Sequence, residues 1–282
     1  REGPAWAVVD GDMSLGMITS IFAMKTAMAK ARATGIAMVT VHNSCHFGAA
    51  GYYTWMASQE NLIGLAMAND IPSVATAGSK GAIFGSNPIA FGAPGGSNPA
   101  MNFDISTAVV AGGKIRLMVS EGKPIPEGWL LTREGKPTTD GTLYPYKASL
   151  LPMAGHKGYG IAMMIDVLSG MLSGSQVRDK IGGWLDEPLS KPTDHGHAFI
   201  AIDPKVFVGL DNYNQAMDAM VAGIKKEPVV DGATPLLIPG ETEHHKREAA
   251  FKDGFIPLSD DVVEMLKTAA AEASIPLPKS LQ

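Results

Sequence analysis

The stretch Gly155-His156-Lys157-Gly158-Tyr159-Gly160 runs directly into the apolar segment Ile161–Leu168. Three glycines and a lysine therefore open a predicted helix over 156–172 that is apolar on almost all sides. The start of a helix offers unpaired backbone N–H groups and the positive end of the helix dipole. Glycines let an anion approach these groups, and a lysine adds a positive charge. The stretch indicates either a phosphate or carboxylate site, or a tight turn that docks a buried helix with Lys157 in solvent.

The same stretch argues against the common nucleotide-binding folds. Gly158-Tyr159-Gly160 is the only Gly-x-Gly in the chain, and Met163 stands where the Rossmann fingerprint requires Gly or Ala. The sequence also contains no Walker A motif, no Gly-x-Ser-x-Gly elbow and no His-Glu-x-x-His. A nucleotide that binds this chain must therefore be held by another fold.

Helices and short strands alternate unevenly along the chain. Helical spacing of apolar residues predicts helices over 14–35, 49–60, 108–120, 212–226, 241–252 and 259–273. Short apolar runs predict strands over 36–41, 62–68, 89–93, 101–105 and 197–203. Residues 121–147 are predicted to form a long loop. This order predicts an α/β fold of the α+β type, with a mixed, largely antiparallel sheet flanked by helices.

The composition narrows the class of protein. Of the 282 residues, 45% are hydrophobic and 18% charged, which is typical of a globular chain with a large core. The net charge of -5 argues against a nucleic-acid partner, and no apolar run is long enough to span a bilayer. The single cysteine, Cys45, excludes an internal disulfide framework and favours a reducing, cytoplasmic location.

Two segments contain histidines that are candidates for catalysis or metal binding. His46 follows a predicted strand in a polar turn, where it serves either as a general acid–base or as a histidine bonded to nearby backbone. Asp194-His195-Gly196-His197 has the residue types of a metal site. We expect no metal there, because His197 begins a predicted strand and His195 is expected to point the other way. A metal-dependent hydrolase is the alternative that this segment leaves open.

Four segments, taken together and in this order, resemble one known family. They resemble the malate/L-lactate dehydrogenase family, which also contains ureidoglycolate dehydrogenase, sulfolactate dehydrogenase and the piperideine-2-carboxylate reductases. The segments are Asn43-Ser-Cys-His46-Phe-Gly-Ala-Ala-Gly-Tyr-Tyr53, Gly85-Ser-Asn87-Pro88-Ile-Ala-Phe91, Leu151–Gly160 with Asp166-Val-Leu-Ser-Gly170, and Ile238-Pro-Gly-Glu241.

The resemblance covers nearly the whole chain and implies an activity. It implies hydride transfer between a nicotinamide cofactor and a 2-hydroxy or 2-oxo acid, with NAD expected and NADP possible. It also implies a non-Rossmann NAD(P)-binding domain over 40–210 and a helical substrate and dimerisation domain formed by 1–39 and 211–282. The expected assembly is a homodimer whose subunits share the active site.

The resemblance also implies roles for individual residues. His46 matches a histidine assigned as proton acceptor in the ureidoglycolate branch. Asp70 stands where the family often has Ser or Thr, and a carboxylate there disfavours the 2′-phosphate of NADP by repulsion. The matching cofactor-contacting positions are Asp70, Asp104, Ile105, Ser106, Lys157, Pro239, Gly240 and Glu241. No metal ligand is implied.

One family element has no counterpart in this sequence. The family begins with helices that carry a Ser-His-Gly segment, whose histidine is the proposed proton donor, followed by an arginine expected to bind the substrate carboxylate. Arg1–Ser14 already resembles the segment that follows it. We expect that this element lies outside the present sequence or has been lost. The second case leaves open a non-catalytic or truncated homologue that binds nucleotide or only dimerises.

Overall fold

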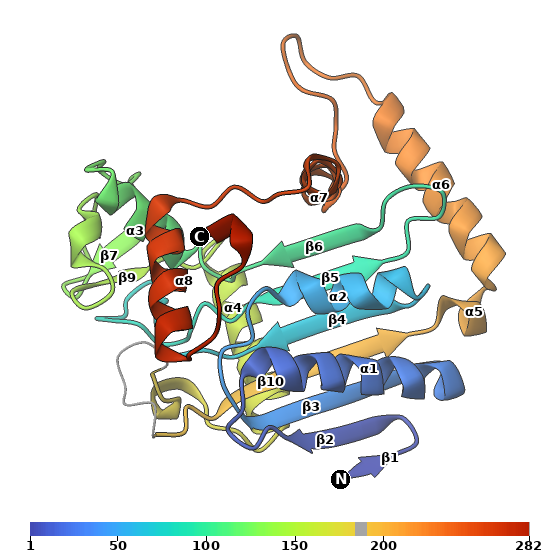
Figure 1. Ribbon diagram of the computed structural model, residues 1–282, viewed down its shortest axis with the longest axis horizontal. Helices are drawn as coiled ribbons and strands as arrows, with labels where there is room; N and C mark the ends of the chain where they lie inside the picture. Colours follow the sequence, from blue (N-terminus) through green and yellow to red (C-terminus); the bar gives the residue numbers. More distant parts are fainter. Residues whose placement is uncertain (184–190, 282) are drawn as a thin grey trace. The chain divides into compact units, whose positions relative to one another are not determined.

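A seven-stranded sheet forms the centre of residues 1–241, and its strands cross the middle of Figure 1. The structure, a computed structural model, describes residues 1–183 and 191–281. Only β2 and β3 pair in parallel, so the predicted mixed, largely antiparallel sheet is confirmed. In sheet order the strands are β1 (Glu2–Gly3), β2 (Trp6–Asp10), β3 (Ile36–Ser44), β10 (His195–Ile202), β4 (Ile63–Ala68), β5 (Ile89–Ala93) and β6 (Met101–Ile105).

Helices α1 (Gly16–Thr34) and α2 (Ala50–Gln59) cover one face of this sheet (Figure 1). The buried side of α1 carries Ala23, Ala27 and Ala31 at four-residue spacing, which lets the helix lie close to β3 and β10. Glycine ends the helix as the sequence predicts, because Gly35 adopts φ +86°.

The opposite face is covered by α4 (His156–Ile165), the π-helix η2 (Asp166–Met171) and α6 (Leu210–Lys226), which follows the short α5 (Pro204–Phe207). The prediction of one buried helix over 156–172 is wrong in two respects. The backbone changes from α to π at Asp166, and Met163, Val167 and Met171 are 51%, 41% and 60% exposed. A single stripe of the helix packs on the sheet, so its apolar outer side stays uncovered within residues 1–241.

The π-helix meets β10 backbone to backbone. A Cβ atom at Gly196 would lie 2.1 Å from the carbonyl oxygen of Ser169. Glycine is therefore the residue that permits this contact at position 196.

Two strands of a smaller sheet, β7 (Leu130–Thr132) and β8 (Pro137–Thr138), lie within residues 121–147, which were predicted to form a long loop, and its third strand, β9 (Ala148–Leu150), follows directly. The strands pair in the order β8-β7-β9, with α3 (Gly112–Ser120) and the 3-10 turn η1 (Gly141–Leu143) beside them. Ile115, Ile125 and Leu130 form its core. The loop prediction is wrong because strands of two or three residues carry too few side chains to show a periodicity.

Five strands bring their loops to one edge of the large sheet. The register aligns Ser44 at the end of β3 with His195 at the start of β10, and Ala68 at the end of β4 with His197. Ile89 at the start of β5 lies beside both Met67 and Ile105. A bulge between His195 and His197 interrupts the pairing with β3 at this edge. The loops that leave here carry most of the polar residues singled out in the sequence.

Residues 242–282 form a second compact unit. It contains most of α7 (Glu241–Asp253), together with α8 (Asp260–Glu272) and the short 3-10 helix η4 (Lys279–Leu281); a further 3-10 turn, η3 (Arg178–Lys180), lies in the first unit. The helices predicted over 241–252 and 259–273 are thus confirmed. Among the described residues, no helix is both long and apolar enough to cross a membrane.

The contact between β5 and α2 provides a test of the packing. A Cβ at Gly92 would lie 2.5 Å from the Thr54 carbonyl oxygen, and the backbone of a helix cannot move aside without a cost in free energy. We predict that Gly92→Ala lowers the free energy of unfolding by about 1–3 kcal/mol in urea denaturation. The matched control is Gly223→Ala in α6, where a Cβ meets nothing within 4 Å, and this change should raise stability by up to about 1 kcal/mol. Equal stability of Gly92→Ala and the parent chain would contradict the described approach of α2.

Candidate active site

A small cleft opens to solvent at the edge where the five strands meet, and its empty space, part of the open solvent included, is about 300 Å³. Its described lining contains three histidines and one carboxylate, and neither lysine nor arginine. The lining residues are His46, Phe47, Gly48, Ala68, Asn69, Asp70, Ser86, Pro88, His195 and His197. They come from the loop after β3, the end of β4, the entrance to β5 and the first residues of β10.

His46 lies on the loop between β3 and α2 and is half-buried. Burial lowers the pKa of His46 below its usual range, and the negative charge of Asp70 offsets part of that effect. The Gly48 N–H donates to Nδ1 at 3.3 Å, which is long for a hydrogen bond and orients the ring only weakly. His46 is therefore neutral at neutral pH and able to accept a proton.

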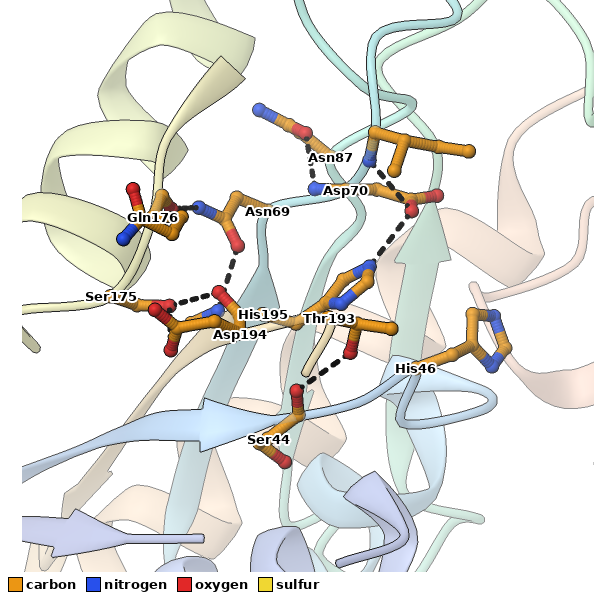
Figure 2. Close-up of polar contacts among 12 residues, drawn as sticks. Ser44, His46, Asn69, Asp70, Asn87, Ser175, Gln176, Thr193, Asp194 and His195 are labelled. Carbon is orange, nitrogen blue, oxygen red and sulfur yellow. Dashed lines mark hydrogen bonds and ion pairs between the residues drawn. The ribbon is translucent and has the colours of Figure 1, made fainter. Parts of the chain in front are cut away.

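Asp70 and His195 form a pair inside the cleft, shown at the centre of Figure 2. The His195 Nε2 atom lies 3.1 Å from Asp70 Oδ1, and the backbone N–H of Ile71 donates to the same oxygen at 2.8 Å. The His195 side chain is 2% exposed and that of Asp70 is 19% exposed. The carboxylate thus faces the cleft, and the imidazole lies behind it.

The expectation that His195 points away from His197 is wrong. Both residues belong to the lining of the cleft, because residues two apart on a strand share a face. The alternation rule therefore contained the signal that would have assigned His195 to the site. Within residues 1–183 and 191–281, no three His, Cys, Asp or Glu side chains are grouped as metal ligands.

His197 is a buried wall of the cleft. Its ring stacks on Phe47 with centroids 4.8 Å apart and planes 9° apart, and it is fully buried. Burial lowers the pKa of His197 to about 3, so the ring is neutral. Neither ring nitrogen has a hydrogen-bond partner among the described residues.

Two asparagines fix the loop that carries Asp70. Asn69 accepts the Gly196 N–H at 2.8 Å and donates to the Gln176 carbonyl at 2.8 Å. Asn87 accepts the Asp70 N–H at 3.1 Å and donates to the Ala162 carbonyl of α4 at 2.9 Å. Figure 2 shows both asparagines beside Asp70. The loop is therefore tied to β10, to α4 and to the segment after η2.

Asp166 lies beneath this loop and was not singled out from the sequence as a site residue. Its side chain is buried, with Oδ1 3.5 Å from Asn87 Nδ2. Burial raises the pKa of Asp166 to about 6, and hydrogen bonds from asparagine side chains partly oppose the shift. An acidic residue in an otherwise apolar helix was the available signal, but only the fold shows where it points.

A second network fixes the end of β3, from which His46 departs. Asp194 accepts the Asn43 N–H at 2.8 Å, and the Ser175 hydroxyl donates to both its side chain and its carbonyl oxygen. The Thr193 hydroxyl donates to the Ser44 carbonyl at 2.9 Å (Figure 2). Asp194 is thereby engaged in holding the backbone.

The predicted cofactor positions at the end of β6 lie next to the cleft. The Ser106 hydroxyl donates to the carbonyl of Ser86, a lining residue, at 3.2 Å. Asp104 Oδ2 accepts the Gly51 N–H at 2.8 Å in the first turn of α2. Ile105, between them, pairs with Ile89 at the entrance to β5.

The positions Pro239, Gly240 and Glu241 lie along the free edge of β6. The Pro239 carbonyl accepts the Asn102 N–H at 2.8 Å, and a Cβ at Gly240, whose φ is +90°, would lie 2.8 Å from the Asn102 carbonyl oxygen. Glu241 pairs with Lys225 at 2.6 Å and accepts the Ile238 N–H at 2.9 Å. These residues lie outside the cleft lining but are connected to it along β6.

Lys157 also lies outside the cleft lining. It is exposed in the first turn of α4, where Gly155 adopts φ +60°. The helix itself is linked to the cleft through the hydrogen bond from Asn87 to Ala162. The structure therefore brings His46 and Asp70 together in the cleft. Asp104, Ile105 and Ser106 lie next to it, whereas Lys157 and residues 239–241 lie outside its lining.

Comparisons with known proteins agree on one family. The family model described as malate/L-lactate dehydrogenase matches residues 1–267. A malate dehydrogenase of Pyrococcus horikoshii is 37% identical over an alignment of 285 residues with gaps included, which covers 98% of this chain and 77% of that protein. The ureidoglycolate dehydrogenase (NAD(+)) of Escherichia coli K12 is 32% identical, covering 94% of this chain and 75% of its own length.

The fold gives the same answer. The solved structure of the sulfolactate dehydrogenase from Methanocaldococcus jannaschii superposes with a TM-score of 0.86 at 33% identity, over 98% of this chain and 78% of that one. The match therefore extends from the strands of the cleft to the helices around them. The chain belongs to the malate/L-lactate dehydrogenase family and is an enzyme of the 2-hydroxy acid dehydrogenase class.

Proposed function

We propose that this chain interconverts a small 2-hydroxy acid and its 2-oxo acid with NAD, and that His46 is the proton acceptor. One observation carries the proposal: a histidine kept neutral by burial shares a small cleft with the Asp70–His195 pair. A neutral imidazole in a confined cleft is the usual group for taking the proton of an alcohol.

Oxidation of the 2-hydroxy acid removes one hydride and one proton from the substrate. A bound nicotinamide would supply the acceptor for the hydride that leaves C2 of the substrate. His46 takes the hydroxyl proton as the C2–O bond becomes a carbonyl. The Asn69 and Asn87 contacts hold the Asp70 loop fixed during this transfer, and the buried His197–Phe47 stack excludes water from one wall.

The residues around the cleft are suited to the cofactor in chemistry. The cleft is small, and its histidines, Asp70 and Asn69 offer polar groups to the nicotinamide ring and a small acid rather than to a whole dinucleotide. The rest of the cofactor must lie outside, and we assign it to Asp104, Ile105 and Ser106 and to Pro239, Gly240 and Glu241. Both sets of residues lie on or against β6, which supports one continuous binding surface for the cofactor.

We propose NAD as the preferred cofactor, with NADP as the competing possibility. Asp104 is an exposed carboxylate at a strand end, and acidic residues in such places bind a ribose hydroxyl and repel a phosphate. Asp70, the carboxylate that lines the cleft, adds a second negative charge nearby. The similarity to an NAD(+)-dependent ureidoglycolate dehydrogenase supports the same choice.

We further propose a homodimer whose subunits share the site. Leu15, Ile18 and Phe22 form one apolar face at the start of α1, and they are 60%, 63% and 59% exposed. This face adjoins the cleft loop, because a Cβ at Gly16 would lie 2.1 Å from the Cys45 carbonyl oxygen. The described cleft lining has no cation for the substrate carboxylate, and a partner subunit seated here is one source of it. The free thiol of Cys45 supports a reducing compartment, and we propose the cytoplasm.

The activity is tested by initial rates with a panel of 2-oxo acids and both reduced cofactors. We expect turnover of at least one small 2-oxo acid, with kcat/KM for NADH at least about tenfold above that for NADPH. Absence of turnover together with absence of NADH binding would contradict the proposal.

The His46→Ala variant should lose at least about a hundredfold in kcat/KM, because the alcohol proton then has no acceptor. Since burial lowers the pKa of His46, hydroxy acid oxidation by the wild type should stay constant through neutral pH. It should fall only on the acid side, with a midpoint below 6.5, where His46 becomes protonated. The exposed His245 provides the control, and His245→Ala should retain full activity. A loss below tenfold in His46→Ala would remove His46 from the chemistry.

The Lys157→Ala variant should weaken NADH binding, measured by fluorescence titration, while the melting temperature stays unchanged. A lysine beside a glycine-rich helix start attracts the cofactor phosphates. Lys205→Ala, an exposed lysine on α5, is the control and should bind NADH normally. Unchanged affinity in Lys157→Ala would identify the Gly155–Gly160 stretch as a docking turn.

The wild-type chain should sediment as a dimer in analytical ultracentrifugation, and Ile18→Asp should shift it toward monomer by burying a charge in the apolar contact. Met220→Asp places the same charge on the exposed side of α6 and should leave the dimer intact. A wild-type chain at the monomer mass would contradict this assembly.

A further inference from the structure

The cleft carries a negative charge with no lysine or arginine in its described lining. Asp70 is the one carboxylate among the lining residues, and its side chain reaches the cleft while the His195 side chain is buried behind it. A charge in a partly buried cleft acts on a ligand there more strongly than a charge in water. The negative charge of Asp70 therefore affects whether the cleft binds a cationic or a neutral ligand more tightly.

We propose that Asp70 selects the redox state of the bound cofactor, so that the cleft favours the oxidised, cationic nicotinamide over the neutral, reduced ring. The inference rests on the proposed function, which places the nicotinamide in the cleft of His46. His46 and Asp70 line the same small cleft, and the negative charge of Asp70 acts on the His46 ring. A ring that exchanges hydride with a substrate held at His46 must then lie close to Asp70.

The other two histidines of the lining, His46 and His197, do not cancel this charge at pH 8. Burial keeps both rings neutral. His195 Nε2 lies 3.1 Å from Asp70 Oδ1 and holds the carboxylate in place. Asp166 lies behind Asn87 and outside the lining.

The expected size of the effect follows from Coulomb's law. Two unit charges about 6 Å apart, at an effective dielectric constant of about 20 to 80, change a binding ratio by roughly threefold to a hundredfold. Removing the charge of Asp70 should therefore raise the Kd for NAD⁺ relative to that for NADH by at least about threefold. A residue that only shaped the cleft would change both Kd values alike.

The test measures binding without turnover. NADH affinity is measured by fluorescence titration and NAD⁺ affinity by displacement of NADH, at pH 8 and without substrate. Asp70→Asn keeps the shape of the side chain and removes its charge, and Asp70→Ser is the second variant in case the first does not fold. Asp211→Asn removes an exposed carboxylate on α6 and is the matched control.

His195→Gln separates charge from packing, because glutamine retains a donor toward Asp70 and leaves the carboxylate in place. We expect the ratio of the two Kd values to shift in both Asp70 variants and to stay within about twofold of the wild type in His195→Gln and Asp211→Asn. An unchanged ratio in the Asp70 variants, or an equal shift in His195→Gln, overturns the inference. Failure of the wild type to bind either form would instead overturn the proposed function, and this inference with it.

Discussion

The pairing of β10 between β3 and β4 is the constraint on which the site depends. β10 lies far from β3 and β4 in the sequence, yet the register aligns Ser44, Ala68 and the two histidines of β10 at one edge. His46 and Asp70 each lie two residues beyond the end of their strands, so the pairing alone brings them to one cleft. The Asn69 and Asp194 hydrogen bonds then fix the loops against β10.

Much of this arrangement follows from local sequence patterns. The strands 89–93 and 101–105 and the helix ending at Gly35 match the structure closely, because apolar runs and glycine caps are local signals. The small sheet of β7, β8 and β9 was missed because its strands are too short for a pattern. The switch from α to π at Asp166 was also missed, since it responds to the packing of η2 on β10, which no local pattern records.

The site residues likewise fall into those that the sequence indicates and those that only the fold reveals. His46 was identified because a histidine after a strand is a local feature, and the resemblance added Asp70 and the residues of β6. The partnership of Asp70 with His195 spans 125 positions and depends on strand order, so no spacing rule predicts it. Asn87 and Asp166 likewise acquire their roles only when α4 packs against the entrance to β5.

The backbone contact between Gly196 and Ser169 also limits how related sequences can diverge. Any side chain at position 196 would separate the π-helix from the strand and shift the two histidines on either side of it. A change of substrate preference in this chain is therefore better made through neighbouring side chains, or through loops from the other strands, than at position 196. The central strand supports the cleft, and the loops around it can vary without disturbing that support.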